Sequence, residues 1–180
     1  MHCKNISMAR QYKSICDFNC DTYMQEWGER LSILYMNARS LKNKLDQIEV
    51  LISQFEVNIS MVVIAETWVS ESEQRYYNLP DFNVVYASRK QPGGGCAIFL
   101  RNSIEFKTVK VIEAHGISYL MIHVTDCDKY FAVIYNPRGT RDMVQHTVQI
   151  LDEQLSGLGS REIFLLGDLN IDLLCDNYES

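Results

Sequence analysis

The apolar run Ser60–Ala65 is the feature that most constrains how this chain can fold. Its residues, Ser-Met-Val-Val-Ile-Ala, include three β-branched side chains and are followed directly by Glu66. A short continuous run of this kind indicates a strand that is buried on both faces. The chain must therefore build a sheet that is covered on both sides.

The segments before this run predict a strand and a helix, so that the chain opens with a βαβ-like unit. Leu31–Met36 is typical of a short buried strand, and Ser40 is a good residue to cap a helix at its N-terminus. Apolar residues then recur at steps of three and four and form one face of a helix: Leu41, Leu45, Ile48, Ile52 and Phe55.

The rest of the chain predicts more strands and a second helix. Thr140 can cap that helix, and its apolar face holds Val144, Val148, Leu151, Leu155 and Leu158. The strands are expected near residues 83–87, 96–100, 106–112, 118–125 and 129–135, and Glu162–Leu166 is another buried, apolar strand. About eight strands and two helices in mixed order predict an α/β (α+β) fold, with two mixed sheets stacked face to face and helices outside.

Length and composition favour one globular domain. The 180 residues are 47% hydrophobic and 22% charged, which excludes a globally disordered chain. We expect residues 1–30 to form a poorly ordered leader and residues 31–180 to form the domain. No apolar run is long enough to span a membrane, and the N-terminus shows no secretory signal. The six scattered cysteines are interpreted as reduced thiols of an intracellular protein, with a disulfide framework or a zinc cluster at Cys3, Cys16 and Cys20 as the weaker alternatives.

Charge is unevenly distributed along the chain. The net charge of −6 does not indicate nucleic-acid binding. Residues 86–110 nevertheless contain five bases and one acid, whereas residues 162–180 contain five acids and no base. This division suits a cation-dependent site that faces a phosphate ester, although solvated loops of mixed charge would explain it equally well.

Polar residues follow three of the strands that are expected to be buried: Asn37 after the first, Glu66 after the second, and Asp168 with Asn170 after the last. Each one alone could be a turn residue, a strand end or a helix cap, whereas together they suit phosphodiester chemistry. Glu66 could bind Mg²⁺, and Asn37 could add an amide oxygen or orient Glu66. Asp168 could orient or deprotonate water, and Asn170 could donate to a phosphoryl oxygen.

Tyr135 and Arg138 lie in a further polar segment, Tyr-Asn-Pro-Arg, at the end of a predicted strand. The phenol could bond a phosphate oxygen and the guanidinium could pair with one, or Tyr135 could simply be an aromatic residue at the surface. The Gly93-Gly-Gly95 turn lacks the features of a phosphate-binding loop and is typical of a tight hairpin.

These residues resemble those of the endonuclease/exonuclease/phosphatase superfamily, which has a DNase I-like fold. The resemblance rests on motifs in the expected order: Asn37-Ala-Arg-Ser-Leu41, Glu66-Thr-Trp68, Gly93-Gly-Gly-Cys-Ala-Ile98, Tyr135-Asn-Pro137 and Gly167-Asp-Leu-Asn170. The wording of these motifs is most similar to the endonuclease domain of non-LTR retrotransposons (LINE-type, Jockey- or CR1-like).

The resemblance implies a four-layer sandwich and a DNA-nicking enzyme that uses Mg²⁺, or alternatively Mn²⁺, and leaves a 3′-hydroxyl. It implies that Glu66 is the main metal ligand with Asn37 beside it, and that Tyr135 contacts the scissile phosphate. Asp168 and Asn170 would position the water and stabilise the transition state. Arg39 and Arg138 are the expected phosphate or DNA contacts, with DNA as the partner, no membrane and no nucleotide cofactor.

The sequence departs from the family at its end, because no histidine follows His146. The Ser-Asp-His motif that closes the family's site is missing, so we expect a truncated domain with impaired activity. A relic that keeps the fold and binds metal or DNA weakly is one alternative. An inositol- or lipid-phosphate hydrolase is the other. An active endonuclease would work inside the cell, and in the nucleus if it cuts chromosomal DNA. Target preference, oligomeric state and any downstream reverse transcriptase lie beyond what the sequence predicts.

Overall fold

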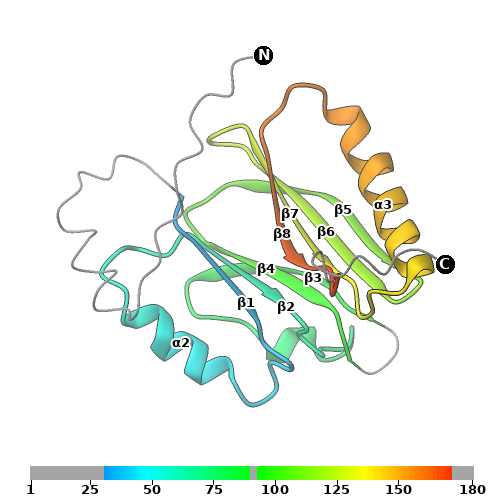
Figure 1. Ribbon diagram of the computed structural model, residues 1–180. Coiled ribbons are helices and arrows are strands. Elements are labelled where there is room, and N and C mark those ends of the chain that lie inside the picture. Colours follow the sequence, from blue (N-terminus) through cyan, green and yellow to red (C-terminus); the bar gives the residue numbers. More distant parts are fainter. Residues whose placement is uncertain (1–30, 90–92, 172–180) are drawn as a thin grey trace.

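The protein folds into two four-stranded sheets that pack face to face (Figure 1). The structure is a computed structural model, and it describes residues 31–89 and 93–171. The first sheet has the order β1-β2-β4-β3 and the second has the order β5-β6-β7-β8. Their bounds are β1 (Ile33–Asn37), β2 (Met61–Ala65), β3 (Phe82–Ala87), β4 (Cys96–Arg101), β5 (Phe106–Ala114), β6 (Ile117–Val124), β7 (Lys129–Tyr135) and β8 (Ile163–Asp168). The prediction of two mixed sheets with about eight strands is thus confirmed for the described residues.

Helices cover the outer faces of the two sheets, which makes four layers (Figure 1). Helix α2 (Leu45–Ser53) places Ile48 and Ile52 against the first sheet, and α3 (Arg141–Leu155) places Ile150 against the second. Two single-turn 3-10 helices, η1 (Gln74–Tyr76) and η2 (Ser156–Leu158), lie in the connections. No helix among the described residues is long and apolar enough to cross a membrane.

The central core lies between the sheets. Alternate residues of β2 and β4, such as Val63 and Ile98, face Leu120 and Val133 from β6 and β7, and all four are fully buried. Because successive side chains of a strand point to opposite faces, the same alternation decides which residues at the strand ends face the gap between the sheets.

Two parallel strand pairs bring four strand ends together. β1 and β2 are parallel and joined through α2, while β7 and β8 are parallel and joined through α3. Parallel strands end at the same edge of a sheet. The two pairs also contact each other across the interface between the sheets, so the segments after β1, β2, β7 and β8 meet at one end of the sandwich.

The first helix starts later than the sequence predicts. It begins at Leu45, and Ser40 does not cap it. The backbone N–H groups of Ser40 and Leu41 instead donate to the carbonyl oxygens of Glu66 and Thr67, at 2.8 and 2.9 Å. These bonds hold residues 38–41 against the segment that follows β2, so the chain cannot turn into a helix until it has left that segment.

The second helix begins at Arg141, directly after Thr140, as the sequence predicts, and Leu151, Leu155 and Leu158 of its predicted face pack against the core of the second sheet. The rest of the predicted face differs from the observed one. Thr147 and Ile150 are buried, whereas Val148 is 59% exposed. The Thr140 side chain makes no capping hydrogen bond. The side of the helix that packs on the sheet carries Met143, Ile150, Leu151 and Leu155, and Val148 lies outside it.

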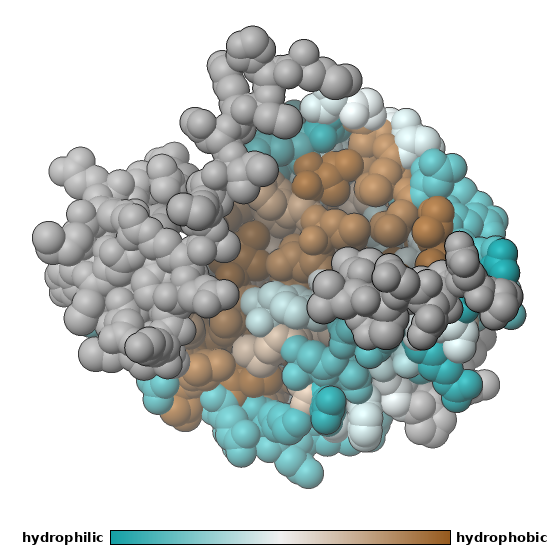
Figure 2. Space-filling view, viewed as in Figure 1, coloured by the Kyte–Doolittle hydropathy of each residue, from teal (hydrophilic) through white to brown (hydrophobic). Residues whose placement is uncertain are grey.

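The expectation that the last strand, Glu162–Leu166, is buried is wrong. β8 pairs with β7 alone among the described strands, so it forms an edge of its sheet, and Phe164 and Leu165 are 38% and 43% exposed. Within the part of the chain that the structure describes, β1 is the edge of the other sheet, and it is only partly buried. Figure 2 shows the apolar area that results on the face of the molecule that carries these strands.

Two of the six cysteines lie among the described residues. Cys96 is a buried free thiol and Cys127 is an exposed one. The leader at 1–30, with the alternative zinc cluster at Cys3, Cys16 and Cys20, lies outside the described residues.

Candidate active site between the two sheets

The end of the sandwich where the parallel pairs meet carries the polar residues that the sequence singles out. Ile33 and Tyr35 of β1 face the central core, so alternation turns Asn37 into the gap between the sheets. In the same way, Leu166 faces the core, so Asp168, two residues later on β8, also faces the gap. Val133 faces the core, so Tyr135 on β7 faces the gap as well. Glu66 follows the last residue of β2. The burial pattern of the strands therefore places all of these groups at one location.

Asn37 links the two sheets through its side-chain amide. Its Nδ2 donates to Glu66 Oε1 at 2.7 Å and to Asp168 Oδ2 at 3.0 Å. Its Oδ1 accepts a hydrogen bond from the backbone N–H of Arg39 at 3.1 Å, which fixes the orientation of the amide. One neutral donor thus stands between two carboxylates, reduces their repulsion and holds both in place.

Glu66 is held from several sides. Its Oε2 accepts a hydrogen bond of 3.3 Å from the indole Nε1 of Trp68. The backbone of the same segment is tied to the glycine turn, because the N–H groups of Thr67 and Trp68 donate to the carbonyl oxygens of Gly95 and Gly94. Glu66 itself has a φ of 55°, in the left-handed region that side chains rarely adopt.

Backbone strain concentrates at this end of the molecule. Among the described residues, eight that are not glycine have a positive φ, and five of them lie in the segments that follow β1, β2 and β8: Arg39, Ser40, Glu66, Trp68 and Asn170. Such conformations persist only where the surroundings enforce them, and they cluster at functional sites.

The phenol of Tyr135 stands beside the two carboxylates. Burial raises its pKa, and the negative charges of Glu66 and Asp168 raise it further, while the nearby Arg89 acts in the opposite direction. Burial and the same two carboxylates also raise the pKa of Tyr35, to about 12. Both phenols therefore keep their protons at neutral pH and can donate hydrogen bonds.

Asn136, Asp168 and Asn170 tie the ends of β7 and β8 together. The side-chain amide of Asn170 donates to the carbonyl oxygen of Asn136 at 2.7 Å, and its backbone N–H donates to Asp168 Oδ1 at 3.0 Å. Asn136 is fully buried; its Oδ1 accepts from the Arg138 N–H, and its Nδ2 has no partner in the described structure. Asp168 is thereby oriented from two sides.

The predicted site residues do not all occupy the same place. Asn37, Glu66 and Asp168 form one hydrogen-bonded group, with Asn170 bonded to Asp168 and Tyr135 beside it. The side chains of Arg39 and Arg138 are exposed, and their backbone N–H groups bond to the side-chain oxygens of Asn37 and Asn136.

Sequence reasoning missed three neighbours of this group: Tyr35, Asn136 and Arg89. The alternation in β1 could have indicated Tyr35, which lies two residues before Asn37. The signal for Arg89 is weaker, because it depends on the turn Gly93–Gly95. At Gly94 (φ +71°), an added Cβ would lie 2.6 Å from Arg89 Cδ and 3.0 Å from Tyr135 Cε1, so the glycine lets both side chains approach the turn.

The oxygen donors at this site fit a hard divalent cation bound in part by water. Within residues 31–89 and 93–171, no group of three or more His, Cys, Asp or Glu side chains could hold a metal ion. Mg²⁺ does not require one, since it commonly binds through one or two carboxylates, several waters and substrate phosphates. The carboxylate of Glu66 meets this need, with the carboxylate of Asp168 on the other side of the Asn37 amide. Asn37 turns its nitrogen, rather than its oxygen, to them.

Solved structures of known enzymes share this fold. They include a mannosyl-6-phosphatase from Bacteroides thetaiotaomicron (TM-score 0.59, 14% identity, 83% of this chain covered) and TDP2 from D. rerio in complex with a single-strand DNA product (TM-score 0.58, 13% identity, 81% covered). The 3′ phosphatase NExo from Neisseria, bound to a product DNA hairpin, matches with a TM-score of 0.57 and 18% identity over 79% of the chain. These matches span 68%, 62% and 58% of the respective solved chains. At these identities the likeness shows the fold.

The sequence itself decides the family. No curated protein matches the chain significantly. A profile of the Endonuclease/Exonuclease/phosphatase family, however, matches residues 18–180, and members of that family are metal-dependent phosphoesterases. The chain therefore belongs to the endonuclease/exonuclease/phosphatase family.

Proposed function

We propose that this chain is a Mg²⁺-dependent phosphodiesterase domain that nicks DNA and leaves a 3′-hydroxyl. The observation that carries the proposal is the amide of Asn37, which joins a carboxylate from each sheet beside the protonated phenol of Tyr135. Two solved structures with the same fold hold DNA products, which supports DNA as the substrate. The order and wording of the Asn37–Leu41 and Glu66–Trp68 motifs support an origin in a non-LTR retrotransposon.

The roles follow from the hydrogen bonds. Asp168, held by Asn37 and by the backbone of Asn170, orients the attacking water and accepts its proton. Tyr135 donates to a non-bridging oxygen of the scissile phosphate. The amide of Asn170 uses one hydrogen for the Asn136 carbonyl, which leaves the second for a phosphoryl oxygen as negative charge grows there. A divalent cation at Glu66, when bound, supplies charge neutralisation to the phosphoryl oxygens and to the leaving oxygen.

Nicking of a supercoiled plasmid tests this proposal. With Mg²⁺ present, we expect wild-type protein to nick, and Glu66→Ala and Asp168→Ala each to lower the rate by about 10²–10⁴-fold. Asp152→Ala is the matched control, because Asp152 is an exposed carboxylate in the last turn of α3 and is not part of the hydrogen-bonded group of Asn37, Glu66 and Asp168. EDTA should abolish nicking by the wild type.

Three outcomes would contradict the proposal. Nicking that survives in both site variants would come from a contaminant or another site. Release of phosphate from inositol phosphates without plasmid nicking would assign the chain to the phosphomonoesterases. A wild-type protein that melts cooperatively but cuts neither substrate would be a relic that only binds.

A further inference from the structure

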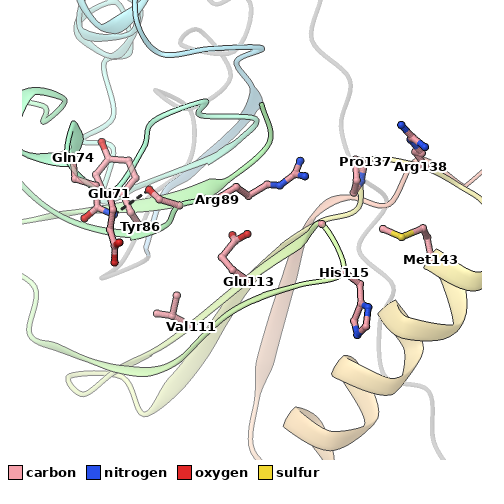
Figure 3. Close-up of a pocket in the computed structure, with 12 residues that line it drawn as sticks. Glu71, Gln74, Tyr86, Arg89, Val111, Glu113, His115, Pro137, Arg138 and Met143 are labelled. Carbon is pink, nitrogen blue, oxygen red and sulfur yellow. Dashed lines mark hydrogen bonds between the residues drawn. The ribbon is translucent and has the colours of Figure 1, made fainter. Parts of the chain in front are cut away.

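A cleft opens next to the candidate site: it is lined by Arg89, whose charge acts on Tyr135, and by Pro137 and Arg138, which follow Tyr135 in the chain (Figure 3). It has a volume of about 960 Å³ and lies between the end of β3, the turn that joins β5 to β6, and the start of α3. Ligand pockets in proteins range from about 300 to 1,000 Å³, so the cleft has room for a group much larger than a phosphate.

Arg89 connects this cleft to the site. Its positive charge acts on Tyr135 in the site and on Glu113 in the cleft. The guanidinium runs past two glycines: an added Cβ would lie 2.6 Å from Arg89 Nη1 at Gly94 and 3.4 Å from Nη2 at Gly116. Among the described residues, no carboxylate lies within ion-pair distance of Arg89. The sequence thus keeps an arginine open to the cleft, with glycines where larger side chains would displace it.

The two ends of the cleft differ in charge. Figure 3 shows Arg138 at one end and Glu71 with Gln74 at the other, where Gln74 is held by a 3.0 Å hydrogen bond to Ser88, and Arg89 and Glu113 lie between them. Burial raises the pKa of Glu113 to about 7, although Arg89 and Ser118 act in the opposite direction. At neutral pH Glu113 is therefore partly protonated and can both accept and donate hydrogen bonds.

We propose that this cleft binds one nucleotide unit of the substrate strand next to the scissile phosphate. The adjacent phosphate lies on the guanidinium of Arg89, and the sugar and base extend toward Gln74 and Glu113. A nucleotide matches the cleft because it has one anionic end and one neutral end whose base edges carry amino and carbonyl groups. The acidic end repels a further phosphate and so limits the cleft to one unit. This inference rests on the proposed function, because it assigns the substrate of the same site.

Binding of a fluorescein-labelled, single-stranded DNA oligonucleotide tests this inference without catalysis. Fluorescence anisotropy in EDTA prevents cleavage of the probe. We expect Arg89→Gln to raise the Kd by about tenfold, and to reduce the slope of log Kd against log salt by about 0.7, the value for one lost phosphate contact. Arg89→Lys should restore most of the slope, since it keeps the charge.

Arg161→Gln is the matched control. Arg161 is exposed, and it precedes β8 at the opposite end of that strand from Asp168. If Arg89→Gln binds the oligonucleotide as tightly as Arg161→Gln does, the inference is overturned. Because the assay measures binding in EDTA, that result would leave the nicking experiment unaffected, and a protein that does not nick could still support the cleft.

Glu113→Gln provides a test that a folding defect cannot imitate. Removal of the negative charge near Arg89 should tighten oligonucleotide binding about threefold at pH 8, where Glu113 is mostly ionised. Unchanged or weaker binding would contradict the proposed position of the phosphate. A nucleoside monophosphate should also displace the probe at a lower concentration than inorganic phosphate does. Equal potency would overturn the assignment of the rest of the cleft to sugar and base.

Discussion

β2 and β8 look alike in sequence and differ greatly in the structure. Each is an apolar run that leads to a carboxylate of the site, Glu66 after β2 and Asp168 at the end of β8. Every residue of β2 is fully buried, with paired strands on both sides, whereas β8 is an edge strand among the described strands and has exposed side chains. Glu66 therefore follows a central strand of one sheet, and Asp168 lies on an outer strand of the other sheet. An apolar run shows that a strand forms, but it does not show how many neighbours cover it.

The largest expected contrast between the two strands is in stability. Ile64→Ala in β2 should lower the free energy of unfolding by about 2–5 kcal/mol, because it leaves a cavity in a fully packed core. Leu165→Ala in β8 should cost less than about 1 kcal/mol, because that side chain is already 43% exposed. Urea denaturation of the two variants measures both values. Similar losses would mean that β8 is covered in solution.

A smaller effect is expected at Gly167, where β8 is constrained through its backbone. Gly167 has a φ of +148°, and an added Cβ would lie only 1.9 Å from the carbonyl oxygen of Ile134 in β7. We expect Gly167→Ala to cost about 1–3 kcal/mol, to push the end of β8 away from β7 and to shift Asp168. Gly157→Ala is the control, since nothing lies within 4 Å of its added Cβ. Thermal melts compare the two, and equal melting temperatures would show that the end of β8 can move freely.

Hydrogen exchange should separate the strands further. Amides of β2 are bonded to strands on both sides and should exchange only when the whole domain unfolds. Amides of β8 bond to β7 alone among the described strands, so they should exchange through local opening and at a faster rate. Native-state exchange followed by mass spectrometry measures this difference. Equal protection of the two strands would show that the strand that carries Asp168 is as rigid as the strand that precedes Glu66.

The smallest effect concerns the loop after β2, which is held by hydrogen bonds between exposed side chains. Glu73 accepts hydrogen bonds from Lys42 and Ser70, and these lower its pKa to about 2 from the ordinary 4.5. Because the pKa is lowered, the contribution to stability is complete above pH 4.5 and is lost as the pH falls toward 2. An NMR titration should find the Glu73 midpoint near 2, and Lys42→Ala should move it back toward 4.5. A midpoint that Lys42→Ala leaves unchanged would show that this contact does not form.

Much of the fold could be predicted because local patterns decide it. All eight strands begin and end within two residues of the positions that hydrophobic runs and turns indicate. The sequence also indicates Asn37, Glu66 and Asp168 correctly as neighbours, since each follows an apolar strand and strand ends carry function.

The remaining features depend on contacts between distant segments. Ser40 has the side chain of a helix cap, but its backbone is bonded to Glu66, which is distant in sequence. The exposure of Phe164 depends on the absence of a second neighbour for β8 among the described strands. Arg89 approaches Tyr135 only because Gly94 leaves space between them. None of these relations produces a periodic signal in the sequence.

Because the amide of Asn37 bonds to both sheets, the geometry of the site depends on the relative position of the two sheets. It donates to a carboxylate from each half of the sandwich, at 2.7 and 3.0 Å, and a side-chain contact of about 3.6 Å is no longer a hydrogen bond. A small shift of one sheet relative to the other would break these two hydrogen bonds before it disturbed the apolar core. Substitutions far from the site that change how the two sheets pack should therefore first displace the carboxylates of Glu66 and Asp168, while the protein still melts cooperatively.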